Sequence, residues 1–91
     1  MQDISQIRKE LDKLDRELMR VLARRMTLIP HVAEYKQLHD LPVQQEEREE
    51  EIIQSKRRLA EKLKLNPDFI EDILRRIIRE ASEMQEKILK S

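Results

Sequence analysis

The sequence predicts an all-helical protein, and two observations carry that prediction. The chain has no glycine and only two aromatic residues, Tyr35 and Phe69, while it is rich in the leucine, glutamate, lysine and arginine that favour helices. Its apolar residues recur every three or four positions, which is the period of an amphipathic α-helix. We therefore expect three helices, one long and two shorter, in a single domain over residues 1–91.

The first helix is expected to run from Asp3 to about His39. Asp3 is followed three residues later by Gln6, a spacing typical of a capping box. The residue before Pro42 is biased away from helix, so the helix should end a few residues earlier. Its apolar stripe consists of Ile4, Ile7, Leu11, Leu14, Leu18, Val21, Leu22, Leu28, Ile29 and Val32.

Pro30 falls inside this long helix and removes one backbone hydrogen bond. A proline in a straight helix interior costs about 3 kcal/mol. Because the apolar stripe continues in phase on both sides, we expect a kink near Met26 rather than a full break.

The second and third helices each have a recognisable start. A run of glutamates over residues 46–51 suits the positive end of a helix dipole. Asn66 followed by Pro67 is typical of a cap and a first helical residue. The second stripe is Glu49, Ile52, Ile53, Leu59, Ala60 and Leu63, and the third is Phe69, Ile70, Ile73, Leu74, Ile77, Ile78, Ala81, Met84 and Ile88.

Composition argues against several classes of function. Lysine plus arginine and aspartate plus glutamate both number 19, so no basic field favours nucleic acid. There is no cysteine, and two histidines without paired carboxylates predict no metal site. The sequence contains neither an apolar run of about 20 residues nor a signal-like segment, so we expect no membrane partner and a cytoplasmic protein.

Four polar residues occupy positions where the stripes should be apolar. Arg25 and Lys36 are eleven residues apart, so they share one helix face about 16 Å apart. Glu49 precedes Ile52 by one turn, and Gln85 shares a face with the third stripe. Each alone could simply reach solvent. Together they predict a closed polar site inside a helical bundle, because buried polar groups need partners or a ligand.

Arg8 lies at the edge of the first stripe but about 42 Å from Lys36 along a straight helix. An antiparallel pairing with a second copy would bring the two residues together. With 38% hydrophobic and 42% charged residues, the chain is also short of core on its own. We therefore expect a homodimer in which Arg8 reaches the partner's site.

Several segments, in this order and at compatible spacing, match a known family. They are "IRKELDKLDRELMRVLARR", the lysine of "VAEYK", "LPVQQEERE" and "IIREASEMQ". The chain resembles the all-helical class of chorismate mutases over nearly its whole length. The resemblance implies an intertwined helical homodimer with two equivalent sites, which converts chorismate to prephenate in aromatic amino acid biosynthesis without a cofactor.

The resemblance also implies roles for individual residues. Arg8 would bind substrate in the partner's site, and Arg25 would bind a carboxylate. Lys36 would contact the ether oxygen and a carboxylate. The other implied contacts are Arg48 as a second-helix arginine, Glu49 for the substrate hydroxyl, and Gln85 as a donor to the ether oxygen.

The walls of the implied site are partly apolar and partly atypical. Val32, Ile52 and Ile78 would form an apolar wall that excludes water. Gln45 stands where many members of the family carry aspartate, and Ala81 stands where a serine often lies. Each departure removes one contact that the family pattern would provide.

Two other functions remain open at this point. An isochorismate-pyruvate lyase has the same fold, although Glu49 after the arginine of the second helix favours the mutase. A non-catalytic helical dimerisation module could use inward charges only to set register. The rearrangement of chorismate requires no nucleophile, metal or proton shuttle, and the sequence offers no persuasive candidate for any of them.

Overall fold

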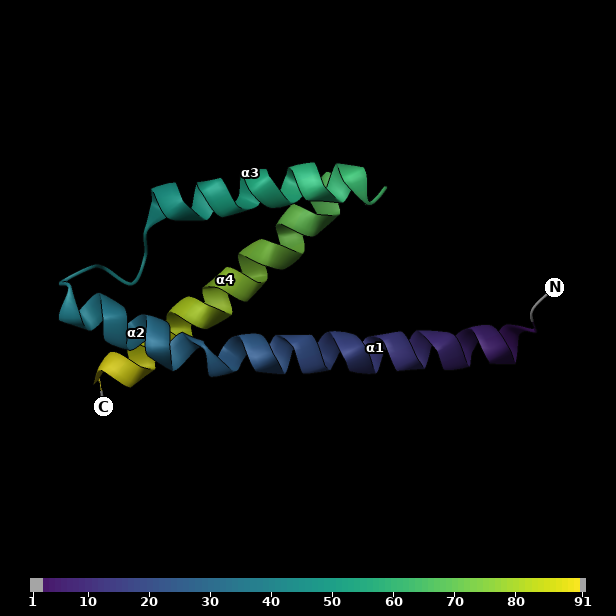
Figure 1. Cartoon of the computed structure of the whole chain (residues 1–91), viewed down its shortest axis with the longest axis horizontal. Coiled ribbons are helices and arrows are strands. Elements are labelled where there is room, and N and C mark those ends of the chain that lie inside the picture. The colour runs from purple at the N-terminus through teal and green to yellow at the C-terminus, as the bar shows by residue number, and fades with distance from the viewer. Residues whose placement is uncertain (1–2, 91) are drawn as a thin grey trace.

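The computed structural model describes residues 3–90, and this part of the chain contains helices and no strands (Figure 1). The helices are α1 (Ile4–Thr27), α2 (Ile29–Leu38), α3 (Glu46–Lys62) and α4 (Pro67–Lys90). Over this range, none is both long and apolar enough to cross a membrane. The prediction of an all-helical fold is confirmed, with the first of the three expected helices present as two segments.

The interruption between α1 and α2 lies at Leu28, two residues beyond the kink expected near Met26. Pro30 falls in the first turn of α2, where its missing N–H has no helical partner to lose. Leu28 keeps right-handed helical angles, φ −85° and ψ −17°, and its N–H donates to the Arg25 carbonyl at 3.1 Å. The helical hydrogen bonds are therefore interrupted, but the phase of the stripe is preserved.

Two helices end in turns that usually contain glycine. Asp40 and Lys64 have φ of 53° and 61°, in the left-handed region. After α2, the Leu41 N–H donates to the Lys36 carbonyl at 2.8 Å, which is the long bond of a Schellman motif. The turn after α3 is closed in the same way. Because the chain has no glycine, both turns place another residue in the left-handed conformation, which glycine adopts at less cost.

Asp3 and Asn66 each cap the helix that follows, although the Asp3 carboxylate contacts Ser5 and not the Gln6 of the expected capping box. The Asp3 carboxylate accepts from the Ser5 N–H at 3.4 Å and from its hydroxyl at 3.0 Å. Asn66 Oδ1 accepts from the Asp68 N–H at 3.0 Å, and Pro67 is the first residue of α4. These side chains satisfy N–H groups that the first turn of a helix leaves without partners.

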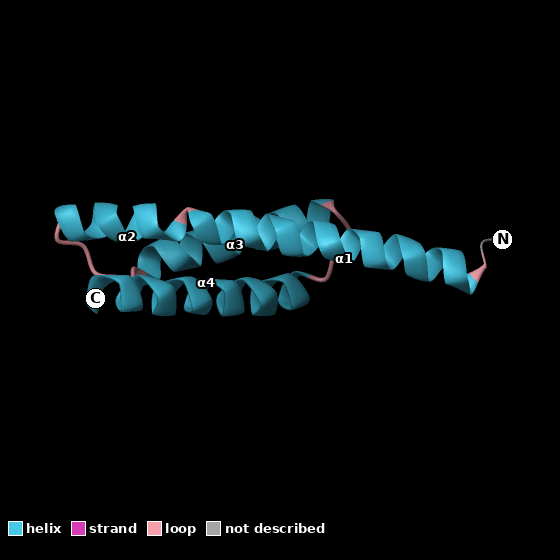
Figure 2. Cartoon of the chain, turned by 90° about the horizontal axis from the view of Figure 1, so that it is seen from below, coloured by secondary structure: helices cyan, strands magenta, loops and turns pink. Residues whose placement is uncertain are grey.

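The packing divides the molecule into two regions. Helices α2 and α3 both pack against α4, whereas α1 projects away along the longest axis (Figures 1 and 2). The buried apolar residues are few and all lie outside α1: Ile29, Ala33, Ile53, Ala60 and Ala81. No residue of α1 is buried, and its stripe residues Leu14 and Leu18 are 55% and 59% exposed. The core of the described chain is as lean as its composition predicts.

Candidate active site

A pocket of about 290 Å³ lies where the end of α1, α2, the start of α3 and the later turns of α4 meet. Ten of the eleven residues that the sequence singled out for a site line this pocket: Arg25, Val32, Lys36, Gln45, Arg48, Glu49, Ile52, Ile78, Ala81 and Gln85. They come from all four helices and the loop before α3. The four polar residues that interrupt the apolar stripes, Arg25, Lys36, Glu49 and Gln85, are thus brought together in one pocket.

Arg8 is the exception. It lies in the second turn of α1, toward the end of the helix that projects away from the rest of the chain (Figure 1). Helical rise places it about 42 Å from Lys36 along the axis of α1 and α2. Within one chain, Arg8 does not belong to the pocket.

The interruption at Leu28 leaves Arg25 and Lys36 on the same pocket although they lie in different helices. Because the helical phase is kept, Arg25, Ile29, Val32 and Lys36 follow one another at spacings of four, three and four residues on one face. Pro30 therefore does not disrupt the convergence of the two cations.

The pocket carries a net positive charge. Arg25, Lys36 and Arg48 contribute three positive charges and Glu49 one negative charge, so the lining sums to +2. The Arg48 guanidinium reaches Glu51 at 3.4 Å, but both side chains are largely exposed and this pair is weak. The arrangement suits a small ligand with two negative charges.

Lys36 is held at the pocket by the loop between α2 and α3. Its Nζ donates to the Val43 carbonyl at 2.6 Å. Burial lowers the pKa of Lys36 below its usual range, and the negative charge of Glu49 partly raises it again. The ammonium is thus partly desolvated, which strengthens its interaction with an anion.

Gln85 places a side-chain amide at the pocket. The side chain is 4% exposed, and its Oε1 has no hydrogen-bond partner among residues 3–90. Such groups are rare in proteins, since an unsatisfied buried polar atom costs free energy. An amide in this position can serve a bound ligand.

A larger hollow of about 670 Å³ lies over the first turns of α3. Four glutamates line it, Glu46, Glu47, Glu50 and Glu51, together with Gln54 and Arg58. Like charges repel, so this hollow is poorly suited to an anionic ligand. The smaller pocket is the candidate site.

Comparison with known proteins identifies the family of the chain. The model of a family described as chorismate mutase type II matches residues 7–86. The chain belongs to this family. A T-protein of Haemophilus influenzae is 42% identical over 81 residues, which cover 89% of this chain and 22% of that protein. A T-protein of Enterobacter agglomerans is 39% identical over 79 residues, which cover 87% of this chain and 21% of that protein.

A bifunctional chorismate mutase/prephenate dehydratase of Buchnera aphidicola is 30% identical over 87 residues, which cover 96% of this chain and 23% of that protein. The chain thus spans about a fifth to a quarter of the length of these relatives. The resemblance to the all-helical chorismate mutases that the sequence motifs indicated is confirmed.

Three lining residues of this chorismate mutase domain were not predicted: Ile29, Val43 and Ser82. Ile29 belongs to the apolar stripe of the first expected helix, and Val43 lies in the segment "LPVQQEERE", where the resemblance gives this residue no role. Ser82 is only 8% exposed and lies three residues before Gln85 on α4. Residues at that spacing share a helix face, so this signal could have identified the hydroxyl in advance.

Proposed function

We propose that the pocket catalyses the rearrangement of chorismate to prephenate. One observation carries the proposal: in a chain of the chorismate mutase type II family, a pocket with a net charge of +2 contains the buried side chain of Gln85, whose amide oxygen has no partner among residues 3–90. Chorismate and prephenate each carry two carboxylates. The charge of the lining therefore complements substrate and product alike.

The first task of the site is to hold a flexible dianion in its reactive conformer. We assign carboxylate binding to Arg25, Arg48 and Lys36, and hydrogen bonding with the substrate hydroxyl to Glu49. Fixing the two reacting carbon atoms near each other removes much of the entropic part of the barrier. The apolar side chains of Val32, Ile52 and Ile78 exclude water from one side of the ring.

The second task is to stabilise the charge that develops in the transition state. One carbon–oxygen bond breaks while one carbon–carbon bond forms, and no atom enters or leaves the molecule. Negative charge grows on the ether oxygen, where the Lys36 ammonium and the Gln85 amide can donate. Donors fixed in advance stabilise this state more than the ground state.

We further propose that the functional unit is an intertwined homodimer. The exposed stripe of α1, with Leu14 and Leu18 more than half exposed, supports this proposal. Antiparallel pairing with a second α1 would cover the stripe and bring Arg8 toward the partner's pocket. A third arginine would then bind the carboxylates.

The decisive test of the function is a steady-state assay that follows the loss of chorismate absorbance and the formation of prephenate. We expect saturable turnover without added metal or cofactor. Isochorismate should be a poor substrate. Release of pyruvate from isochorismate, with no prephenate formed from chorismate, would establish a lyase instead.

The shared site is tested by complementation. Arg8→Ala and Lys36→Ala variants should each be nearly inactive, because each lacks one contact in every site. After subunit exchange, half of the dimers are mixed and one of their two sites has both residues, so about a quarter of the activity should return. No recovery despite proven exchange would mean that Arg8 does not act in the partner's site.

A further inference from the structure

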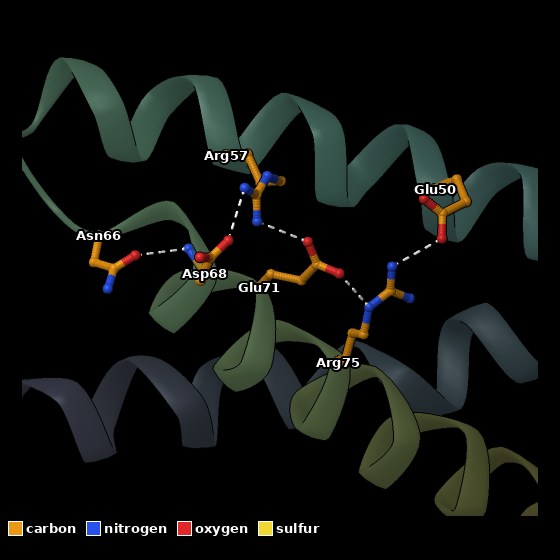
Figure 3. Close-up of polar contacts among 6 residues, drawn as sticks. All are labelled: Glu50, Arg57, Asn66, Asp68, Glu71 and Arg75. Carbon is orange, nitrogen blue, oxygen red and sulfur yellow. Dashed lines mark hydrogen bonds and ion pairs between the residues drawn. The ribbon is translucent and has the colours of Figure 1, made fainter.

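A continuous chain of ion pairs joins α3 to α4 (Figure 3). It runs through Asp68, Arg57, Glu71, Arg75 and Glu50, with charges that alternate in sign. The successive contacts measure 2.9, 2.8, 2.8 and 2.8 Å. None of these residues lines the pocket of about 290 Å³, so the proposed mechanism does not use them.

This ion-pair chain holds α3 at two points. Arg57 and Glu50 lie seven residues apart on α3, which corresponds to about 10.5 Å along the helix. Glu71 on α4 joins the two points, because its Oε1 accepts from Arg57 and its Oε2 accepts from Arg75. One exposed ion pair would let the helices pivot. Two points joined by a common carboxylate fix their relative position.

Apolar packing supplies little of this precision. In the described chain, Ile53 is the only large side chain that is fully buried. A core holds its elements in one arrangement through many interdigitating contacts, and the interface of α3 and α4 offers few. Polar contacts at the edge of the interface therefore gain importance for the alignment of the two helices.

Arg75, the partner of Glu50 in the ion-pair chain, lies beside residues that line the pocket. Arg75 lines a small hollow of about 180 Å³ together with Glu49, Ile78 and Ser82. The same three residues also line the pocket of about 290 Å³. Glu50 is also the neighbour of Glu49 in α3. A shift of α3 at Glu50 would therefore move Glu49 relative to α4.

We infer that Glu50 and Arg75, anchored through Glu71, are positioning residues that hold the Glu49 carboxylate in place within the pocket. This inference rests on the role of Glu49 in the proposed function, but its main test does not depend on turnover. Hydrogen bonding to Arg75 lowers the pKa of Glu71, and hydrogen bonding to Glu50 raises that of Arg75, so both pairs remain ionised at neutral pH.

The main test measures the pKa of Lys36 by NMR titration of its side chain. The Glu49 charge raises this pKa, so the pKa of Lys36 reports how near Glu49 lies. Arg75→Ala is the informative variant, because loss of a positive charge would by itself raise the pKa of Lys36. Displacement of Glu49 acts in the opposite direction. We expect the pKa of Lys36 to fall in Arg75→Ala, toward its value in Glu49→Gln.

The matched control is the neighbouring ion pair of α4. Arg76 contacts Glu80 at 3.2 Å within the same helix and does not reach α3. Arg76→Ala should leave the pKa of Lys36 unchanged. Alanine is the best helix former, so both substitutions preserve α4. A rise or no change of the pKa of Lys36 in Arg75→Ala would overturn the inference.

A second measurement connects the displacement to turnover. Glu50→Ala and Arg75→Ala should each lower kcat/KM by about tenfold, since a small misplacement of a binding group is costly. In a Glu49→Gln background, Glu50→Ala should change kcat/KM by less than about twofold, because the group that it positions is already lost. Equal factors in both backgrounds, with helix content unchanged, would contradict the inference. Positioning effects on Lys36 without any turnover of chorismate would instead refute the proposed function and leave the inference intact.

Discussion

Helix α1 and the α2–α4 unit carry the same kind of amphipathic stripe but use it differently. Every buried residue of the described chain lies in α2, α3 or α4, and α1 has none. Polar interruptions of the stripe in α2–α4 gather around one pocket with Arg25 from the end of α1, whereas Arg8 points to no site within its own chain. Periodicity thus identifies an apolar face, but it does not say whether that face is covered within the chain.

The largest effect should come from placing charge on the exposed stripe of α1. A Leu14→Glu, Leu18→Glu double variant puts two carboxylates one turn apart where we propose that a partner packs. We expect a monomer by sedimentation and a loss of activity on the order of a hundredfold or more. Arg16→Glu is the control, because position 16 lies about 200° from both leucines. A folded, active monomer would show that activity does not require a partner on the exposed stripe of α1.

Gln85→Glu tests the role that we propose for Gln85 in the pocket. The new carboxylate can donate a hydrogen bond only when protonated, and its reference pKa is about 4.3. Activity at pH 8 should fall by about a hundredfold, as when one donor to a developing oxyanion is lost, and should recover as pH falls through the folded-state pKa.

Gln37→Glu, on the exposed face of α2, should show no such acid activation. Equal activity of the Gln85 variant at pH 5 and pH 8 would mean that Gln85 does not face the breaking bond.

A smaller effect concerns the alkaline limb of the pH profile of kcat/KM, which reports the pKa values of groups in the free enzyme. Burial lowers the pKa of Lys36, so binding of the dianion should weaken at a pH below the ordinary titration of lysine. Because Glu49 raises that pKa, Glu49→Gln should move the limb to still lower pH. A limb that stays in place would show that Lys36 and Glu49 do not interact across the pocket.

The smallest effect is on stability in the turn after α3. Lys64 has φ of 61°, which glycine adopts without strain, so Lys64→Gly should raise the free energy of unfolding by about 0.5 kcal/mol. The same change at Lys56, which is exposed in the interior of α3, should lower it by about 1 kcal/mol. Urea unfolding compares the two variants directly. The same sign for both would indicate that the left-handed turn carries no strain.

Helix boundaries were predictable where a local chemical signal exists. Asn66 and Pro67 mark the start of α4, and Pro42 forces α2 to end before it, because each acts through its own backbone. The pocket lining was largely predictable as well: four polar residues interrupt the apolar stripes, and the resemblance to the chorismate mutases implied six more of the residues that line it. The interruption at Leu28 was only approximately placed, because a proline can be accommodated by several distributions of the lost hydrogen bond.

Contacts between helices were not predictable in this way. Arg57 and Glu71 are ordinary surface residues in the sequence, fourteen positions apart. Their pairing depends on the angle and offset at which α3 packs against α4, and a one-dimensional pattern does not contain these quantities. The burial of Ser82 likewise depends on neighbours from other helices, although its place on the same face of α4 as Gln85 follows from their spacing.

In the homodimer that we propose, a second copy covers the exposed face of α1, so the stability of the fold would depend on mass action. Whatever covers that face adds its own binding free energy to the folded state and none to the unfolded one. The melting temperature should then rise with protein concentration, and dilution alone should weaken the fold. For such a chain, abundance in the cell is itself a determinant of stability.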